Sequence, residues 1–147
     1  SNCANREETW INKSIISTHI TLHDLGYAHS IEVWEDKKLK GGLYGVAIGK
    51  VFFAESMFST SSNGSKLALI ALMGTLALNQ FLLLDVQFMT NHLRTMGAKE
   101  ISRPIFLNLI RKSSYEKVQF NEPSSAIIDE MLINKAEKKS LVGISKL

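Results

Sequence analysis

Two acidic residues stand in strongly apolar stretches, where an ionised side chain is costly to bury without a partner. Glu55 lies in VFFAESMFS, among three phenylalanines and a methionine, and Asp85 follows three leucines in LLLDVQF. An acid at the end of a strand often caps a helix or pairs with a lysine, but acids in such surroundings also mark functional sites. Two of them in one short chain favour a site.

Strand alternation predicts where these acids point. Side chains two residues apart share a face, so Phe53, Glu55 and Met57 are expected on one side of their strand. The same rule places Asp85 and Gln87 together, and a carboxylate and a carboxamide at this spacing are within reach of one ligand. Two apolar strands that each carry an acid near the carboxyl end predict a pocket with apolar walls and a polar lip.

The elements that carry these residues predict an α+β domain with helices packed on a sheet. Apolar spacings of three and four predict helices, and alternating or continuous short apolar runs predict strands. The order is helix, three-stranded antiparallel meander, apolar central helix, buried strand and two short helices. The expected helices span 7–25, 66–78, 90–96 and 104–112, and the expected strands span 29–34, 42–48, 51–55 and 81–88. Ser65 and Ser102 are expected to cap the second and fourth helices.

The chain divides into a domain over residues 1–120 and a tail over residues 121–147. Pro123 and the two serines after it break the preceding pattern, and residues 127–139 are rich in lysine and glutamate. We expect this tail to be an appendage that is helical or partly disordered.

Composition bounds the function classes. The 147 residues are 45% hydrophobic, enough for one packed domain, and their net charge of +3 permits a polyanionic partner without demanding one. Cys3 is the single cysteine, which excludes an intrachain disulfide and a cysteine-based metal cluster and fits a reducing cytoplasm. No signal-peptide pattern opens the sequence. The leucine-rich run 67–84 is interrupted by polar residues, so a buried helix and strand explain it better than a membrane span.

The histidines and tryptophans give weaker signals. His19 and His23 have a spacing that can hold a metal, but no third ligand is near in sequence. His29 and His92 are isolated, and no nucleophile–histidine order can be argued from spacing. Trp34, like the tryptophan at position 10, is expected first as a core or half-buried aromatic and second as a base-stacking residue.

Basic residues outnumber acidic residues between residues 94 and 117. Two interpretations stay open for this stretch: a solvated helical surface, or a patch that contacts phosphates. The residues are Arg94, Lys99, Arg103, Arg111, Lys112 and Lys117, against Glu100 and Glu116.

Five segments in order closely resemble the leucyl/phenylalanyl-tRNA–protein transferase family. They are AHSIEVW, GGLYGVAIG, FAESMFS, DVQ and HLRTMGAKEISR, between Thr9 and about Leu109. The resemblance implies a GNAT-like (acyl-CoA N-acyltransferase-like) mixed sheet with flanking helices over residues 1–120. It also implies the transfer of Leu, Phe or Met from aminoacyl-tRNA to proteins that begin with Arg or Lys, which marks them for degradation in the bacterial N-degron pathway.

The resemblance also assigns site residues. Asp85 and Gln87 match the family's proposed catalytic pair, in which the carboxylate helps to orient or deprotonate the attacking amine, and Glu55 matches its pocket acid. The substrate-binding positions are Leu43 and Met57 as pocket walls, Phe53, Ser56, and Trp10, which packs on the terminal adenosine of the tRNA. The implied partners are the 3′ end of aminoacyl-tRNA and the acceptor proteins. No metal, cofactor or membrane is implied, and we expect a cytoplasmic monomer.

Two other readings stay open. An acyl-CoA-dependent GNAT N-acetyltransferase would share the order of elements, but its Arg/Gln-x-x-Gly-x-Gly/Ala phosphate loop corresponds here to residues 61–66, which keep one glycine. The family also has an N-terminal lobe, and this sequence is expected to begin after it. A non-catalytic remnant that binds RNA or protein is therefore the second alternative.

Overall fold

The computed structural model describes residues 11–113, 118–121 and 142–145 of the chain. Within these residues the helices are α1 (Lys13–Asp24), α2 (Gly64–Leu78), α3 (Asn91–Thr95) and α4 (Arg103–Ser113). The strands are β1 (Ala28–Glu35), β2 (Lys38–Ile48), β3 (Val51–Ser59), β4 (Leu83–Asp85), β5 (Lys99–Ile101) and β6 (Val142–Ser145).

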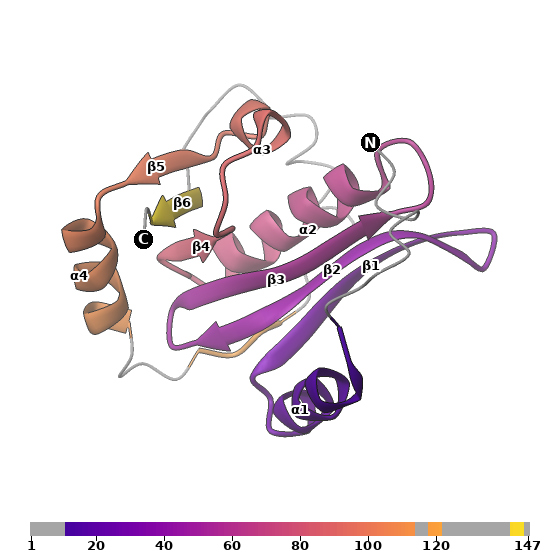
Figure 1. The fold of residues 1–147 in the computed structure, drawn as a ribbon, viewed down its shortest axis with the longest axis horizontal. Coiled ribbons are helices and arrows are strands. Elements are labelled where there is room, and N and C mark those ends of the chain that lie inside the picture. Colours follow the sequence, from indigo (N-terminus) through magenta and orange to yellow (C-terminus); the bar gives the residue numbers. More distant parts are fainter. Residues whose placement is uncertain (1–10, 114–117, 122–141, 146–147) are drawn as a thin grey trace.

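One six-stranded mixed sheet organises the domain (Figure 1), with the strand order β1-β2-β3-β4-β6-β5. The first three strands form an antiparallel meander, and β4, β6 and β5 continue the sheet in parallel with β3. In Figure 1, α2 runs along the sheet, α1 lies beside the β1 end, and α3 and α4 lie at the β5 end. The predicted α+β class, with a mixed sheet and flanking helices, is confirmed.

The meander follows from two tight turns. Asp36 and Lys37 connect β1 to β2 with φ values of 47° and 61°, the left-handed pair that a two-residue hairpin turn prefers. Gly49 and Lys50 connect β2 to β3, and Gly49 also has a positive φ of 56°. The three predicted strands are therefore confirmed, and each is longer than predicted.

Neighbouring residues of β2 separate the two faces of the meander. Leu43 is buried in the core beneath α2. The next residue, Tyr44, packs its ring against the ring edge of His19 in α1, with a centroid distance of 5.1 Å. Because successive strand side chains point to opposite faces, α1 and α2 lie on opposite faces of the meander. We call these the α1 face and the α2 face.

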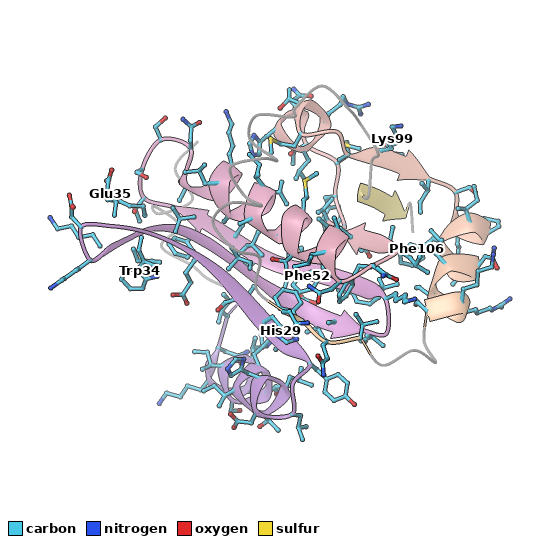
Figure 2. The ribbon with its side chains drawn as sticks, turned by 180° about the vertical axis from the view of Figure 1, so that it is seen from behind. His29, Trp34, Glu35, Phe52, Lys99 and Phe106 are labelled. Atoms are coloured by element: carbon cyan, nitrogen blue, oxygen red, sulfur yellow. The ribbon has the colours of Figure 1, made fainter. Side chains whose placement is uncertain are left out.

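Helix α2 is the centre of the core, as its almost uniformly apolar sequence predicts. Its buried residues include Ala68, Leu69, Leu72 and Leu76, which join Phe52 of β3 in one apolar cluster. Figure 2 shows His29 of β1 and Phe52 of β3 near each other. Phe120 stacks on the ring of His29 at a centroid distance of 4.1 Å and reaches Phe52 at 5.6 Å.

The start of α2 differs from the prediction. Asn63, with φ 69°, occupies the N-cap position without a side-chain hydrogen bond, and Ser65 lies inside the helix. The Ser65 N–H instead donates to Oγ of Ser59, the last residue of β3. The start of α2 also lies very close to β2. A Cβ on Gly41 of β2 would lie 2.5 Å from the carbonyl carbon of Gly64. The end of β3 thus provides the cap that Ser65 was expected to provide.

Other helix boundaries agree with their capping signals. Asn12 caps α1 through a hydrogen bond from the Ile15 N–H, and the part of the predicted helix before residue 11 lies outside the described residues. Thr90 caps α3 through the Leu93 N–H. In α4 the Phe106 N–H donates to the carbonyl of Ser102, in agreement with the predicted start of that helix.

The tail contributes an element that the sequence does not predict. Strand β6 pairs with β4 on one side and with β5 on the other, so this part of the tail lies within the sheet and is not an appendage. Strand β5 was also not predicted. The helix expected over residues 127–139 lies outside the described residues. The division of the chain at residue 120 stays a prediction.

The leucine-rich run 67–84 is shared between α2 and β4. In the described part of the chain, no helix combines the length and the apolar character that crossing a membrane requires.

Candidate functional site

A β-bulge in the pairing of β2 with β3 sets the position of Glu55. Tyr44 of β2 pairs with Ser56 of β3. The next residue of β2, Gly45, pairs with Ala54, so Glu55 has no partner in β2. One extra residue in a strand reverses the faces of the side chains beyond it. The alternation rule therefore does not hold across Glu55.

The bulge separates residues that were expected to share a face. The prediction that Phe53, Glu55 and Met57 lie on one side of β3 is wrong. Met57 pairs with Leu43 and packs against the core on the α2 face. Phe53 follows the core residue Phe52 and therefore points to the α1 face. The structure thus places Leu43 and Met57 together on the α2 face, without Phe53.

Asp85 is buried at the carboxyl end of β4, with 8% of its surface exposed. The parallel pairing of β4 with β3 places it beside Phe53. Its Oδ1 accepts a hydrogen bond of 2.9 Å from the backbone N–H of Gln87. Burial raises the pKa of the Asp85 carboxyl above its ordinary value, and the hydrogen bond from Gln87 opposes this shift. No ion pair is recorded for Asp85 within the described residues.

Gln87 does not share a strand face with Asp85, in contrast to the prediction, because β4 ends at Asp85. Gln87 has a φ of 63°, and the Phe88 N–H donates to the carbonyl of Val86 at 2.7 Å, which closes a three-residue γ-turn. This backbone conformation costs about 1–2 kcal/mol for a residue other than glycine. Strained residues of this kind concentrate at functional sites, and the Gln87 residue is exposed.

Strand β3 continues beyond the point where β4 ends. The recorded pairs between these two parallel strands stop at Phe53 and Asp85, whereas β3 extends to Ser59. Among the described residues, no strand pairs with this last part of β3 on the β4 side. Glu55 lies two residues past the last pair. Both acids therefore lie where the parallel strands part, and the carboxyl ends of such strands commonly hold ligands.

The negative charge of Glu55 affects the pKa of Tyr44. Burial raises the pKa of the Tyr44 hydroxyl, and the negative charge of Glu55 raises it further. Ser56, as the cross-strand partner of Tyr44, shares its face, which is the α1 face. The structure thus brings Glu55 close to Tyr44, a residue that the sequence did not single out, because this proximity depends on the register of two strands.

A cavity of ≈ 760 Å³ opens beyond the end of β3, within the size range of small-molecule sites. Among the predicted site residues that the structure describes, Met57 alone lines it. Hydroxyl and amide side chains dominate the rest of the lining, and Lys66 is its formally charged residue. The lining comprises Met57, Phe58, Ser59, Thr60, Ser61, Ser62, Asn63, Ser65, Lys66, Thr90, His92 and Leu93.

His92 is a further candidate that the sequence did not identify. Its Nε2 is buried and has no hydrogen-bond partner within the part of the chain that the structure describes. Buried ring nitrogens are normally paired with protein or water, so an unpaired one beside a cavity suits a ligand. No sequence pattern indicates this role, because His92 is isolated from other candidate residues along the chain.

A second hollow lies between α1 and the strands β1 and β2. It measures ≈ 350 Å³, and its lining includes four isoleucines of the α1 region, three histidines and Tyr44. The ring Nδ1 atoms of His19 and His23 lie 2.9 Å from the backbone carbonyls of Ile15 and Ala28. Among the described residues no group of three potential ligands forms a metal site. The larger cavity fits the chemistry better, because it lies at the end of the strand that carries Glu55.

The remaining predicted site residue, Trp10, lies outside the described residues, as does Cys3. Trp34 lies on β1 with 57% of its surface exposed and donates through Nε1 to Glu32, so it is not a core residue and at most half of it is buried.

Comparison with known proteins then decides the family. Residues 1–111 match the family model described as leucyl/phenylalanyl-tRNA protein transferase. This chain belongs to that family.

Several curated leucyl/phenylalanyl-tRNA–protein transferases are similar to the chain. The protein of Dinoroseobacter shibae is 54% identical over 109 residues, which cover 74% of this chain and 49% of the relative. That of Maricaulis maris is 48% identical over 126 residues, 86% of this chain and 56% of the relative. That of Paramagnetospirillum magneticum is 44% identical over 130 residues, 88% and 62% respectively. The chain spans about half the length of the relatives it matches.

Proposed function

We propose that this chain carries the aminoacyl-transfer site of a leucyl/phenylalanyl-tRNA–protein transferase. The site would move Leu, Phe or Met from aminoacyl-tRNA to the α-amino group of a protein that begins with Arg or Lys, and so mark that protein for N-degron degradation. One observation carries the proposal: the buried carboxyl of Asp85 lies where β4 ends and β3 continues with the bulged Glu55.

The reaction in this proposal is the aminolysis of an ester. The acceptor nitrogen attacks the aminoacyl carbonyl carbon, the new C–N bond forms, and the ester C–O bond to the ribose breaks. The amine gives up one proton, and the departing ribose oxygen gains one. Oδ1 of Asp85 is engaged by the Gln87 N–H, whereas no hydrogen bond is recorded for Oδ2 in the described residues. Oδ2 would accept the amine proton.

Burial supports this role for Asp85. A carboxyl whose pKa is raised holds a proton more strongly than an exposed one and is therefore a better general base, provided that it is ionised at the working pH. The hydrogen bond from Gln87 fixes one oxygen and so orients the other. Glu55 would provide a negative charge near the cationic Arg or Lys side chain of the acceptor. It is partly buried and lies near the point where β3 and β4 part.

The transferred side chain requires an apolar slot. Leu43 and Met57 face each other across β2 and β3 on the α2 face, against the buried core. We assign the walls of the slot to this pair. Ser56 and Phe53 lie on the other face and would contact other parts of the substrates. Trp10 keeps the role that the resemblance implies, on the terminal adenosine of the tRNA.

We further propose that the domain is GNAT-like and acts as a cytoplasmic monomer. The crossover from β3 through α2 to the parallel β4, together with the parting of these strands beyond Asp85, supports that fold assignment. Aminoacyl-tRNA and newly exposed protein N-termini occur in the cytoplasm, which supports the location.

A transfer assay tests the proposed function. The chain is mixed with radiolabelled Phe-tRNA and a peptide that begins with Arg, and with a matched peptide that begins with Asp. Label in the Arg peptide alone is expected. Absence of transfer under all conditions, or acetylation of the same peptide from acetyl-CoA, would contradict the proposal.

A further inference from the structure

The formal charge of the described chain is segregated along the sequence. Residues 11–89 contain six basic and six acidic residues, so their charges cancel. Residues 90–113 contain five basic residues and one acid, which gives a net charge of +4. The positive charge of residues 11–113 therefore comes entirely from the segment that forms α3, β5 and α4.

These three elements lie together at one edge of the sheet. Strand β5 is the outermost strand, at the end opposite β1, and α3 and α4 precede and follow it in the chain. In Figure 1 both helices lie at this end, and Figure 2 labels Lys99 on β5. Arg94 in α3, Lys99 in β5 and Arg103 at the start of α4 are all exposed. We call these three residues the basic edge.

The cations of the basic edge are available to a partner. Within the described residues, no ion pair is recorded for Arg94, Lys99 or Arg103. The one acid of the segment, Glu100, follows Lys99 in β5, so the two side chains point to opposite faces of the strand. An edge with three exposed cations, whose single acid points to the strand face opposite Lys99, fits a polyanion better than a protein surface of mixed charge.

The basic edge is also connected to the candidate site. Helix α3 begins six residues after Asp85, and Thr90 and His92 of this region line the cavity of ≈ 760 Å³. Strand β5 is separated from β4 by β6 alone, a distance of about 10 Å at the usual strand spacing. A polyanion on the basic edge therefore lies beside the site.

We propose that the basic edge binds the phosphate backbone of the tRNA whose aminoacyl end enters the site. This inference rests on the proposed function for the identity of the nucleic acid. Arg and Lys that contact phosphates position a nucleic acid without reading its sequence. Each neutralised phosphate releases counterions, so binding weakens as salt rises.

The test is the binding of fluorescent, uncharged tRNA to the chain, measured by anisotropy between about 50 and 200 mM salt. The variant Arg94→Ala/Lys99→Ala/Arg103→Ala is expected to bind at least about tenfold more weakly. Its slope of log K against log[salt] is expected to fall by about two to three, because each lost phosphate contact removes about 0.7–0.9 from the slope.

A matched control removes the same charge elsewhere. Lys13→Ala/Lys37→Ala/Lys38→Ala deletes three exposed lysines from α1 and the β1–β2 hairpin, at the other end of the sheet. Its affinity is expected to stay within about twofold of the wild type, and circular dichroism checks that both variants are folded. Arg94→Lys/Arg103→Lys, which keeps the charge, is expected to retain most of the binding. Equal losses in the two alanine variants, or no loss in the first, would overturn the inference.

Uncharged tRNA separates this inference from the proposed function. If the wild type transfers Phe while the basic-edge variant binds tRNA normally, the inference fails and the proposed function stands. If no protein transfers Phe but the basic-edge variant alone loses tRNA binding, the inference stands and the proposed function fails.

Discussion

The carboxylate of Asp85 holds the backbone of Gln87: its Oδ1 accepts a hydrogen bond of 2.9 Å from the Gln87 N–H. This bond connects the end of β4 to a γ-turn in which Gln87 has a φ of 63°. A residue in a costly conformation needs support from its surroundings, and Asp85 supplies it. The two residues that the family resemblance pairs are therefore coupled through the backbone of one and the side chain of the other.

This coupling predicts opposite stabilities for two substitutions of Asp85. Asp85→Asn retains an oxygen that can accept the Gln87 N–H, whereas Asp85→Ala removes it and is expected to lower the free energy of unfolding by about 1–3 kcal/mol. The folded pKa of Asp85 is raised, so its ionisation destabilises the fold as pH rises through that pKa, and the cost is present at neutral pH. Asp85→Asn is therefore expected to equal or exceed the wild type at pH 7 in urea unfolding. A clear loss with Asp85→Asn would contradict the coupling.

The strain at Gln87 predicts a separation of stability from activity. Gln87→Gly removes the left-handed penalty of about 1–2 kcal/mol but adds the entropy cost of glycine, about 0.5–1 kcal/mol. The free energy of unfolding is expected to hold or to rise slightly, while Phe transfer falls. Gln80→Gly is the matched control, because Gln80 also has a positive φ, 57°, and lies just after α2. Equal transfer by the two variants would remove Gln87 from the site.

The bulge predicts that Gly45 cannot carry a side chain. A Cβ on Gly45 would lie 2.5 Å from a ring carbon of Phe52 and would also meet the carbonyl of Phe53. Gly45→Ala is expected to cost about 1–3 kcal/mol and to reduce transfer, because Gly45 adjoins the bulge that places Glu55. Gly26→Ala adds the same methyl group where nothing lies within 4 Å, and its effect is confined to backbone strain at φ 80°. Unchanged transfer in a folded Gly45→Ala protein would show that the bulge does not set the site.

The ring of His29 predicts a pH dependence of stability. Burial lowers its pKa below 6.5, the nearby His23 acts in the same direction, and a backbone hydrogen bond at Gly26 opposes both. The unfolded chain then binds more protons than the folded chain between the two pKa values, so stability falls as pH drops below about 6.5. His29→Phe keeps a ring beside Phe120 and is expected to flatten this dependence in thermal unfolding between about pH 5 and 7. An unaltered pH profile would contradict the assignment.

The sequence predicted those parts of the fold that local pattern determines. Alternation identified β1, β2 and β3, and the apolar run identified α2, because each pattern repeats over many residues. The short strands β5 and β6 were missed, since three or four residues carry no period and their pairing partners are distant in sequence. The prediction of Ser65 as the cap of α2 was wrong. The capping oxygen belongs to Ser59, which accepts a hydrogen bond from the N–H of Ser65, six residues later in the chain.

For the candidate site, the sequence indicated residues but not their geometry. Apolar surroundings singled out Glu55 and Asp85, and both lie where β3 and β4 part, whereas their functional roles stay predictions. The shared face of Phe53 and Met57 was wrong because a bulge, which depends on register, reverses the alternation. The unpaired Nε2 of His92 could not be predicted, because burial beside a cavity depends on tertiary packing.

The most direct test of the central claim is single-turnover transfer of Phe from Phe-tRNA to an Arg-initiated peptide by Asp85→Asn, compared with the wild type over a range of pH. The wild-type rate is expected to rise as Asp85 ionises, above the ordinary carboxyl range because its pKa is raised. Asp85→Asn is expected to be about 10²–10⁴-fold slower, the usual contribution of a general base, and to lack that rise. A rate and a pH profile equal to those of the wild type would contradict the claim that Asp85 takes the proton of the attacking amine.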